Sequence, residues 1–196
     1  MSPSQPKLRI GIDLTPLLPV ETGVDHYLTQ LVHALACVDH EAQFTVFINR
    51  EDRERIIGKV GKNFSIIPIA TRSRLIHLLA QQIILPVMAM SLRLDVIHSP
   101  SFLMPLFRGT QKHLLTIFDM TMFSLPNCHI WYRHNRLFLK AVAMSIRHAD
   151  LITVPSLFVK KGIIRLMPEI KSDRIGMIPF GVGAHFASSE ITDTSR

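Results

Sequence analysis

Apolar and polar residues alternate along the chain in blocks that predict strands and helices in turn. Short runs of consecutive apolar residues, typical of strands buried on both faces, are separated by segments with apolar residues at helical spacing. We expect seven strands, at Lys7–Leu14, Gln43–Asn49, Phe64–Ile69, Asp95–Pro100, His113–Asp119, Leu151–Ser156 and Arg174–Phe180. This order favours right-handed crossovers, and therefore an α/β domain with a Rossmann-like, doubly wound and mostly parallel sheet.

The segments between these strands predict helices. Gly23–Cys37 has an apolar stripe at helical spacing, and Thr22 followed three residues later by Asp25 is a helix start signal. Arg72–Leu92 is expected to form one long helix with a kink at Pro86, because proline lacks an N–H group and clashes with the preceding turn. Further helical segments are expected at about 131–148, at about 156–167 and in the charged stretch from 51 onwards.

Composition and charge limit the class of protein. The chain has 196 residues, of which 47% are hydrophobic and 19% charged, as in globular proteins. Its net charge of +7 is compatible with nucleic acid, an anionic membrane surface or a phosphate-bearing substrate. No nucleic-acid-binding motif accompanies this charge, so a nucleic-acid partner is not expected. Cys37 and Cys128 lie far apart without C-x-x-C neighbours, which argues against a disulfide framework or a zinc site.

Two segments bear on membrane contact. Leu75–Leu92 is apolar but interrupted by polar residues and a proline, so we expect a buried or surface-lying helix that does not span. Trp131–His148 places basic residues among apolar ones, namely Arg133, Arg136, Lys140 and Arg147. Such a helix favours an anionic membrane surface, and an ordinary solvated face is the alternative. Because no signal-peptide core is visible, we expect a cytoplasmic location, peripheral on the inner face of the plasma membrane.

Candidate chemistry collects where the predicted strands end. The carboxyl ends of parallel strands share one edge of a sheet, and ligands bind there. Asp119 follows the apolar run Leu114–Phe118; it could contact a substrate, or it could cap the following turn. Polar residues after the other strands give further candidates, namely His98, Ser99, Ser101, Thr121 and Ser156. His98 could bond to a sugar hydroxyl or a phosphate, or it could be a hydrogen-bonded core histidine.

Gly23 opens a predicted helix whose first N–H groups carry a positive partial charge, so an anion such as a phosphate is expected there. The alternative is a tight-turn glycine, because no complete G-x-G-x-x-G is present. His26, His33 and His40 recur every seven residues without a carboxylate to complete a metal site. No metal or other cofactor is therefore expected.

Five segments then resemble, in order and spacing, the amino-terminal domain of GT-B retaining glycosyltransferases of the mannosyltransferase-like family 4, relatives of glycosyltransferase group 1. They read RIGIDLTPLLPVETGVDHYLTQLVHAL, DVIHSPSFLMPL, LLTIFDMTMFSLP, ADLITVPSLFVKKGI and RIGMIPFGVGAHF, and together reach from Arg9 to Phe186. The resemblance implies an enzyme of two Rossmann-like domains, in which the amino-terminal one holds the acceptor and the carboxy-terminal one the nucleotide-sugar donor. It also implies that Thr22 and Gly23 lie near the donor phosphates and that Asp119 is catalytic.

Two positions depart from this family pattern. Phe118 stands where the family has a histidine, and a phenyl ring can neither donate nor accept a conventional hydrogen bond. His98 is the nearest replacement by topology, and Gly183 replaces the acidic or amide residue usual after GV. We expect an acceptor-side domain at 1–186 and a linker or disordered tail at 187–196. The carboxy-terminal donor-binding domain is expected to be absent, which would leave this chain alone incomplete and inactive.

These observations predict the amino-terminal domain of a hexosyltransferase-type enzyme of polysaccharide biosynthesis. It would transfer a sugar from a nucleotide donor to a glycan or lipid-linked acceptor with retention of configuration. The acceptor contacts would come from His98, Ser99, Ser101, Thr121 and Ser156. The alternative is a noncatalytic module that binds an acceptor or a membrane surface and works with a separate donor-domain chain.

Overall fold

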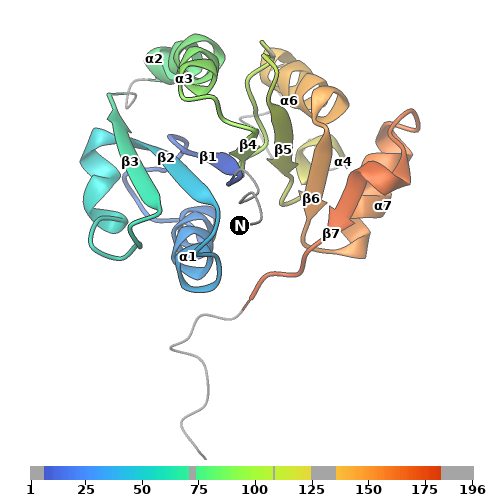
Figure 1. Cartoon of the computed structure of the whole chain (residues 1–196). Coiled ribbons are helices and arrows are strands. Elements are labelled where there is room, and N and C mark those ends of the chain that lie inside the picture. The colour runs from blue at the N-terminus through green and yellow to red at the C-terminus, as the bar shows by residue number, and fades with distance from the viewer. Residues whose placement is uncertain (1–6, 71–73, 108, 125–135, 182–196) are drawn as a thin grey trace, which may run out of the picture.

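The computed structural model describes residues 7–70, 74–107, 109–124 and 136–181. Seven strands in these residues form one sheet in the order β3-β2-β1-β4-β5-β6-β7, and every neighbouring pair is parallel (Figure 1). The strands are β1 Arg9–Leu14, β2 Gln43–Asn49, β3 Phe64–Ile69, β4 Val96–Ser99, β5 Lys112–Thr116, β6 Leu151–Val154 and β7 Ile175–Met177. The predicted Rossmann-like, doubly wound α/β fold is confirmed.

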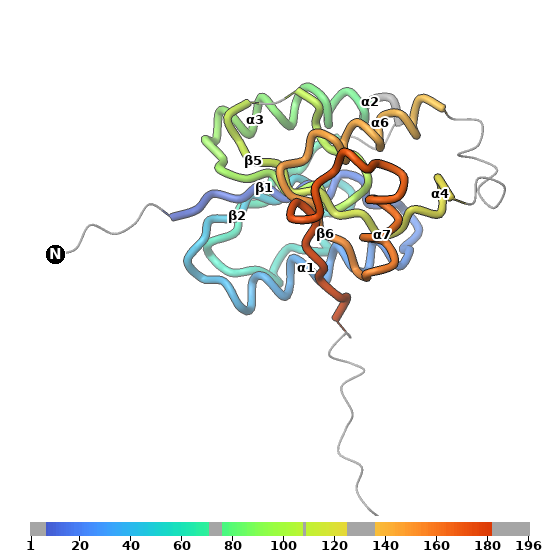
Figure 2. The backbone as a smooth tube through the Cα atoms, turned by 90° about the vertical axis from the view of Figure 1, so that its right-hand side faces the viewer, coloured from blue at the N-terminus to red at the C-terminus, as the bar shows by residue number. Residues whose placement is uncertain are grey.

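Helices cover both faces of the sheet. Figures 1 and 2 show α1 on one side and α2, α3 and α6 on the other. The α-helices are α1 Gly23–Val38, α2 Arg74–Leu79, α3 Leu85–Ser91, α4 Thr121–Ser124, α6 Arg136–His148 and α7 Leu157–Leu166. A π-helix, η2, spans Ala80–Ile84, and 3-10 helices lie at η1 Arg50–Arg55 and η3 Ser172–Arg174. The sheet is thus the middle of three layers.

Strand β2, the neighbour of the edge strand β3, is buried on both faces, as its apolar run predicts. Val46, Phe47 and Ile48 are consecutive residues of β2, and none of them has any exposed surface. Successive side chains of a strand point to opposite faces, so both faces of β2 must be covered. On one face of the sheet, Ile48 packs against Leu28 of α1 in one apolar cluster. On the opposite face, Phe47 packs with Leu85 of α3 in a second cluster.

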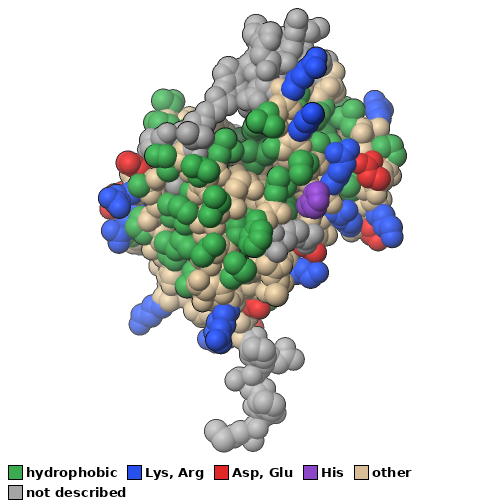
Figure 3. All heavy atoms as spheres, turned by 90° about the horizontal axis from the view of Figure 1, so that it is seen from above, with side chains coloured by type: hydrophobic (Ala, Val, Ile, Leu, Met, Phe, Trp, Pro, Cys, Tyr) green, Lys and Arg blue, Asp and Glu red, His purple; other side chains and the backbone are tan. Residues whose placement is uncertain are grey.

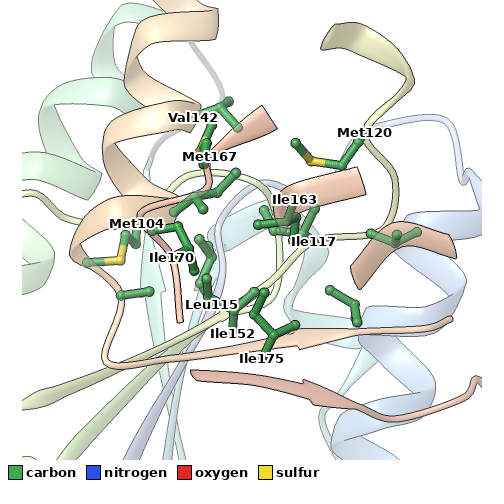
Figure 4. Close-up of a cluster of buried hydrophobic side chains, with 14 of the residues drawn as sticks. Met104, Leu115, Ile117, Met120, Val142, Ile152, Ile163, Met167, Ile170 and Ile175 are labelled. Carbon is green, nitrogen blue, oxygen red and sulfur yellow. The ribbon is translucent and has the colours of Figure 1, made fainter. Parts of the chain in front are cut away.

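A third apolar cluster joins the second half of the sheet to α6 and α7. Figure 4 shows Leu115 and Ile152, from β5 and β6, beneath Val142 of α6 and close to Ile163 of α7. All four side chains are completely buried. This packing fixes α6 over β5 and β6, and residues of α6 form one wall of the site described below.

The helical segment before β4 departs from its predicted form. The expected single helix at Arg72–Leu92 is a run of α2, η2 and α3. In η2 the N–H of Leu85 donates to the carbonyl of Ala80, one residue further back than in an α-helix. Pro86 follows directly, where its missing N–H and its ring disfavour a regular α-helical turn. The wide π-turn before Pro86 therefore accommodates the proline within the helical segment.

Other predicted bounds also change. β5 ends at Thr116, so Asp119 lies in the loop beyond the strand rather than at its last position. The charged segment after β2 is the 3-10 helix η1, and α6 is described only from Arg136 onwards. The expected helix residues 131–135, the expected tail 187–196 and Gly183 lie outside the described residues.

Candidate functional site

A cavity of about 900 Å³ lies at the carboxyl edge of the sheet, on the side of α6. Its walls come from the loop after β1, from α2 and η2, from the loop after β4, and from α6. The lining residues are Thr15, Pro16, Leu17, Leu18, Pro19, Asn49, His77, Leu78, Gln81, Gln82, Ser101, Phe102, Leu103, Met104, Leu106, Leu137, Phe138, Ala141 and Ser145. Segments far apart in the sequence therefore build a single ligand-sized space.

Asp13, the penultimate residue of β1, organises the polar end of this cavity. Its Oδ1 accepts hydrogen bonds from Thr15, from the backbone N at 3.0 Å and from Oγ1 at 2.6 Å. Its Oδ2 accepts from Nε2 of Gln81 at 3.1 Å. Asp13 has no exposed surface, and these donors compensate for the burial of a carboxylate. The carboxylate thus ties β1 to η2.

Two neighbouring amides of η2 hold the loop after β4. Gln82 donates from Nε2 to the carbonyl of Met104 at 3.1 Å and accepts at Oε1 from the N–H of Leu106 at 2.8 Å. Gln81 also donates to the carbonyl of Leu103 at 3.3 Å. The π-turn is wide enough to direct both amides into the protein, and π-turns are common at functional sites.

Asn49 fixes the loop after β1 from the other side. Its Nδ2 donates to the carbonyl of Thr15 at 2.9 Å, and it lies 3.2 Å from Oδ2 of Asp52. The residue is 1% exposed and ends β2. Asn49, Gln81 and Gln82 were not predicted as site residues. The sequence signal for the glutamines was a polar pair inside the apolar segment before Pro86, and for Asn49 a polar residue at a strand end.

At the first turn of α1, the predicted anion site takes the form of a capping box. Thr22 and Asp25 cap each other, with a hydrogen bond between Thr22 Oγ1 and Asp25 Oδ2, and Asp25 Oδ1 accepts from the N–H of Leu18 at 2.8 Å. Asp25 is 2% exposed and places a negative charge at the positive end of the helix. A side chain at Gly23 would meet no atom within 4 Å, so the backbone there is open. Gly23 offers space, while Asp25 reduces the attraction for an anion.

The catalytic candidate Asp119 makes the turn contacts of its alternative interpretation. Its Oδ1 accepts from the backbone N–H of Thr121 at 2.8 Å and from Oγ1 of Thr121 at 2.5 Å. The same D-x-T arrangement joins Asp13 and Thr15. Asp119 remains partly exposed, whereas Asp13 is enclosed. The structure therefore brings Asp119 and Thr121 together at the carboxyl edge, with one carboxylate oxygen used by the turn.

His98 belongs to a polar network on the α1 side of the sheet, away from the cavity. Its Nε2 lies 2.9 Å from Oγ1 of Thr116, which is 2.8 Å from Oγ1 of Thr153 and is also hydrogen-bonded to Tyr27. The ring is 8% exposed, and burial lowers the pKa of His98 from 6.5 to about 4. Burial also raises the pKa of Tyr27. His98 is thus a buried, hydrogen-bonded histidine that is neutral at neutral pH and lies outside the cavity lining.

The serine candidates are distributed over the same edge. Ser101 lines the cavity. Ser99 is 1% exposed, and its Oγ has no hydrogen-bond partner among the described residues. Ser156 caps α7 by accepting from the N–H of Val159 at 3.3 Å. Of the predicted acceptor contacts, only Ser101 lies in the cavity wall.

Phe118 stands in an aromatic cluster beside the cavity. Its ring centroid lies 5.2 Å from that of Tyr27, 5.6 Å from Phe180 and 5.9 Å from Phe102. Phe102 also lines the cavity, so the cluster connects the cavity wall to the residue that precedes Asp119. At the position where the family has a hydrogen-bonding histidine, this chain thus has a flat apolar surface.

Neither a metal centre nor a membrane span is found in the described part of the chain. No group of three or more His, Cys, Asp or Glu side chains there could hold a metal ion. No described helix has the length and apolar character needed to cross a bilayer.

Comparisons with known proteins give one family and one structural likeness. Residues 22–185 match the family model described as Glycosyltransferase Family 4. The crystal structure of a glycosyltransferase from Rickettsia africae ESF-5 is similar at 17% identity and a TM-score of 0.48, over 90% of this chain and 44% of that chain. The chain thus spans less than half the length of that protein. No match was found among curated protein sequences.

Proposed function

Because the chain belongs to glycosyltransferase family 4, we propose that it is the acceptor-side domain of an enzyme that transfers a sugar from a nucleotide donor to a glycan or lipid-linked acceptor. The observation that carries this proposal is the match of residues 22–185 to the family model. A cavity at the carboxyl edge, where ligands of parallel sheets bind, supports the acceptor-side role. The reaction retains the anomeric configuration, consumes the nucleotide sugar as a substrate and needs no cofactor.

In this proposal Asp119 acts at the reacting centre. Both of its turn contacts use Oδ1, so the turn holds the carboxylate in one orientation. The carboxylate would orient an acceptor hydroxyl toward the donor sugar, and a fixed side chain does this at little entropic cost. Thr22 and Gly23 would lie near the donor phosphates through backbone N–H groups, for which the open surface at Gly23 leaves room. The base and ribose contacts would come from a carboxy-terminal domain.

Membrane contact is a second part of the proposal, on the face formed by α2, α3 and α6. Figure 3 shows apolar side chains gathered in one area of this face, with Lys and Arg side chains around it. Ile83, Val87 and Leu137 are 57%, 50% and 78% exposed. Arg136 and Lys140 of α6 are exposed and form no ion pair with another described residue. Exposed apolar groups beside basic ones suit the inner face of an anionic membrane.

A noncatalytic binding module is the second candidate, and Phe118 favours it. The position of the family histidine holds a ring packed against three other aromatic rings. Neither hydrogen bonding nor proton transfer is possible there. The buried and neutral His98 faces the other side of the sheet from the cavity, and its Nε2 is bonded to Thr116. This module would bind the acceptor or the membrane and work with a separate donor-domain chain.

Binding experiments on the purified chain test the acceptor-side assignment. Isothermal titration with common nucleoside diphosphate sugars should show no tight binding, because an exposed helix end contributes only about 0.3–1 kcal/mol to an anion. Micromolar binding requires about 8 kcal/mol. A parallel sugar-release assay should show no turnover, whereas extracted membrane lipids or glycans should bind. Micromolar affinity for a nucleotide sugar, or multiple turnovers, would overturn the assignment.

A further inference from the structure

The run of α2, η2 and α3 exposes apolar side chains on the side that faces away from the sheet. Five large apolar residues recur along it every three or four positions, namely Ile76, Leu79, Ile83, Val87 and Met90. Each of these residues is between 40% and 57% exposed. Their spacing places them along one helical face, which we call the ridge.

The ridge carries no charge and is fixed on the domain. From Leu75 to Leu92 the chain has no Asp, Glu, Lys or Arg residue. On the opposite side of the same helices, Leu85 and Ala89 are buried and pack with Phe47 of β2. The helices therefore stay on the sheet, and only their outer side chains can reach a partner. A contiguous exposed apolar surface of this kind marks a contact with a protein or a membrane.

The distribution of charge favours a membrane as that partner. Residues 56–149 contain eleven Lys and Arg but two acidic residues, a net charge of +9, whereas the rest of the chain has a net charge of −2. α2, η2, α3 and α6 all come from this cationic part and contain no acidic residue. Figure 3 shows Lys and Arg side chains around the apolar ones on this face. Two copies that met through this face would bring like charges together, whereas a bilayer offers phosphates to the cations and hydrocarbon to the ridge.

We propose that the ridge inserts its outer side chains into the surface of a bilayer and thereby recognises loosely packed lipid, independently of lipid charge. An uncharged surface gains binding free energy from the apolar area that it buries, so it needs gaps between headgroups where hydrocarbon is accessible. The inference rests on the membrane contact proposed above. It divides that contact between α6, whose cations respond to lipid charge, and the ridge, which responds to lipid packing.

Flotation of the purified chain with neutral vesicles tests the inference without a contribution from lipid charge. Vesicles of dioleoylphosphatidylcholine are loosely packed, and vesicles of dipalmitoylphosphatidylcholine with cholesterol are tightly packed, while the headgroup is the same. The buffer contains about 0.5 M NaCl, at which the Debye length is about 4 Å and attraction between exposed charges is screened. We expect the chain to float with the loosely packed vesicles and to bind the tightly packed ones at least about tenfold more weakly.

Matched substitutions on the two sides of the sheet locate the contact. Ile83→Ser with Val87→Ser removes two half-exposed apolar side chains from the ridge and should weaken binding to loosely packed vesicles about tenfold or more. Val38→Ser makes one of the same changes at a 76% exposed position at the end of α1, on the other side of the sheet, and should bind like the wild type. All three positions are exposed, so the variants should fold, and circular dichroism verifies this.

The outcomes separate this inference from the proposed membrane contact and from the proposed enzyme. Binding to anionic vesicles that disappears at high salt, or equal binding to both neutral vesicles, would overturn insertion by the ridge and leave the charge-dependent contact of α6. Self-association of the wild-type chain that the double variant abolishes would assign the ridge to a second copy and also overturn the inference. Absence of binding to any vesicle would count against both membrane proposals and leave glycosyl transfer unaffected.

Discussion

The buried histidine of β4 makes stability depend on pH in a defined window. Burial lowers the pKa of His98 to about 4, whereas an unfolded chain gives the ordinary value of 6.5. Between these two values the unfolded state binds a proton that the folded state excludes. The free energy of unfolding should therefore fall as pH decreases from 6.5 to 4, and the contribution should stay constant on either side of this window.

The size of this effect follows from the pKa difference. A fall from 6.5 to about 4 corresponds to about 3 kcal/mol lost between pH 7 and pH 4. Whole-domain stabilities are commonly about 5–15 kcal/mol, so the loss is large enough to measure. His98→Gln removes the titrating group and keeps an amide that can bond to Thr116. The variant should lack this part of the acid dependence.

Urea unfolding at half-unit steps from pH 7 to pH 4 measures the effect. Because carboxylates titrate equally in both proteins, the difference between wild type and His98→Gln isolates the histidine. Thr116→Val is the control: it removes the hydrogen bond to Nε2 and leaves the ring buried. It should lower stability at every pH, by about 1–3 kcal/mol, and keep the wild-type slope. Parallel curves for wild type and His98→Gln would refute the reasoning.

Three further predictions concern the catalytic candidate, the helix cap and the basic helix. Asp119→Asn keeps an oxygen for the turn, so in a complete enzyme transfer should fall severely while the unfolding free energy changes by less than about 1 kcal/mol; equal losses of both would make the residue structural. Asp25→Ala should destabilise the chain by about 1–2 kcal/mol in denaturant unfolding, because the cap of α1 is lost, and an unchanged midpoint would contradict this. The double variant Arg136→Gln, Lys140→Gln should bind anionic liposomes more weakly in cosedimentation, by about 1 kcal/mol of binding free energy per charge removed. Arg147→Gln should weaken binding less, because Arg147 is already paired with Glu169. Equal binding to neutral and anionic liposomes would leave α6 an ordinary solvated face.

The sequence was sufficient for the sheet because local patterns determine buried strands. β2 and β3 have the predicted bounds, Gln43–Asn49 and Phe64–Ile69, since both are short and mainly apolar runs. β5 ends earlier than predicted because Ile117 and Phe118 continue its apolar pattern after the ladder with β4 has stopped. Apolar character indicates burial, and buried residues can also lie in loops.

The cavity could not be predicted in the same way. Gln81 meets Asp13, which is 68 positions away in the chain, and that contact depends on the wide turn of η2. A π-turn differs from an α-helix by one residue, so the pattern of apolar residues does not reveal it. His98 bonds to Thr116 of the neighbouring strand β5, and the sequence of neither strand reveals that contact. Long-range packing decided each case.

The central claim is that this domain presents an acceptor for glycosyl transfer. The most direct test joins the chain to the donor-binding domain of a family 4 enzyme and supplies nucleotide sugars with a lipid-linked acceptor. Mass spectrometry and proton NMR of the product then report the added sugar and its anomeric configuration. We predict an acceptor enlarged by one sugar in the configuration of the donor. An unchanged acceptor, with the donor intact or merely hydrolysed, would contradict the claim.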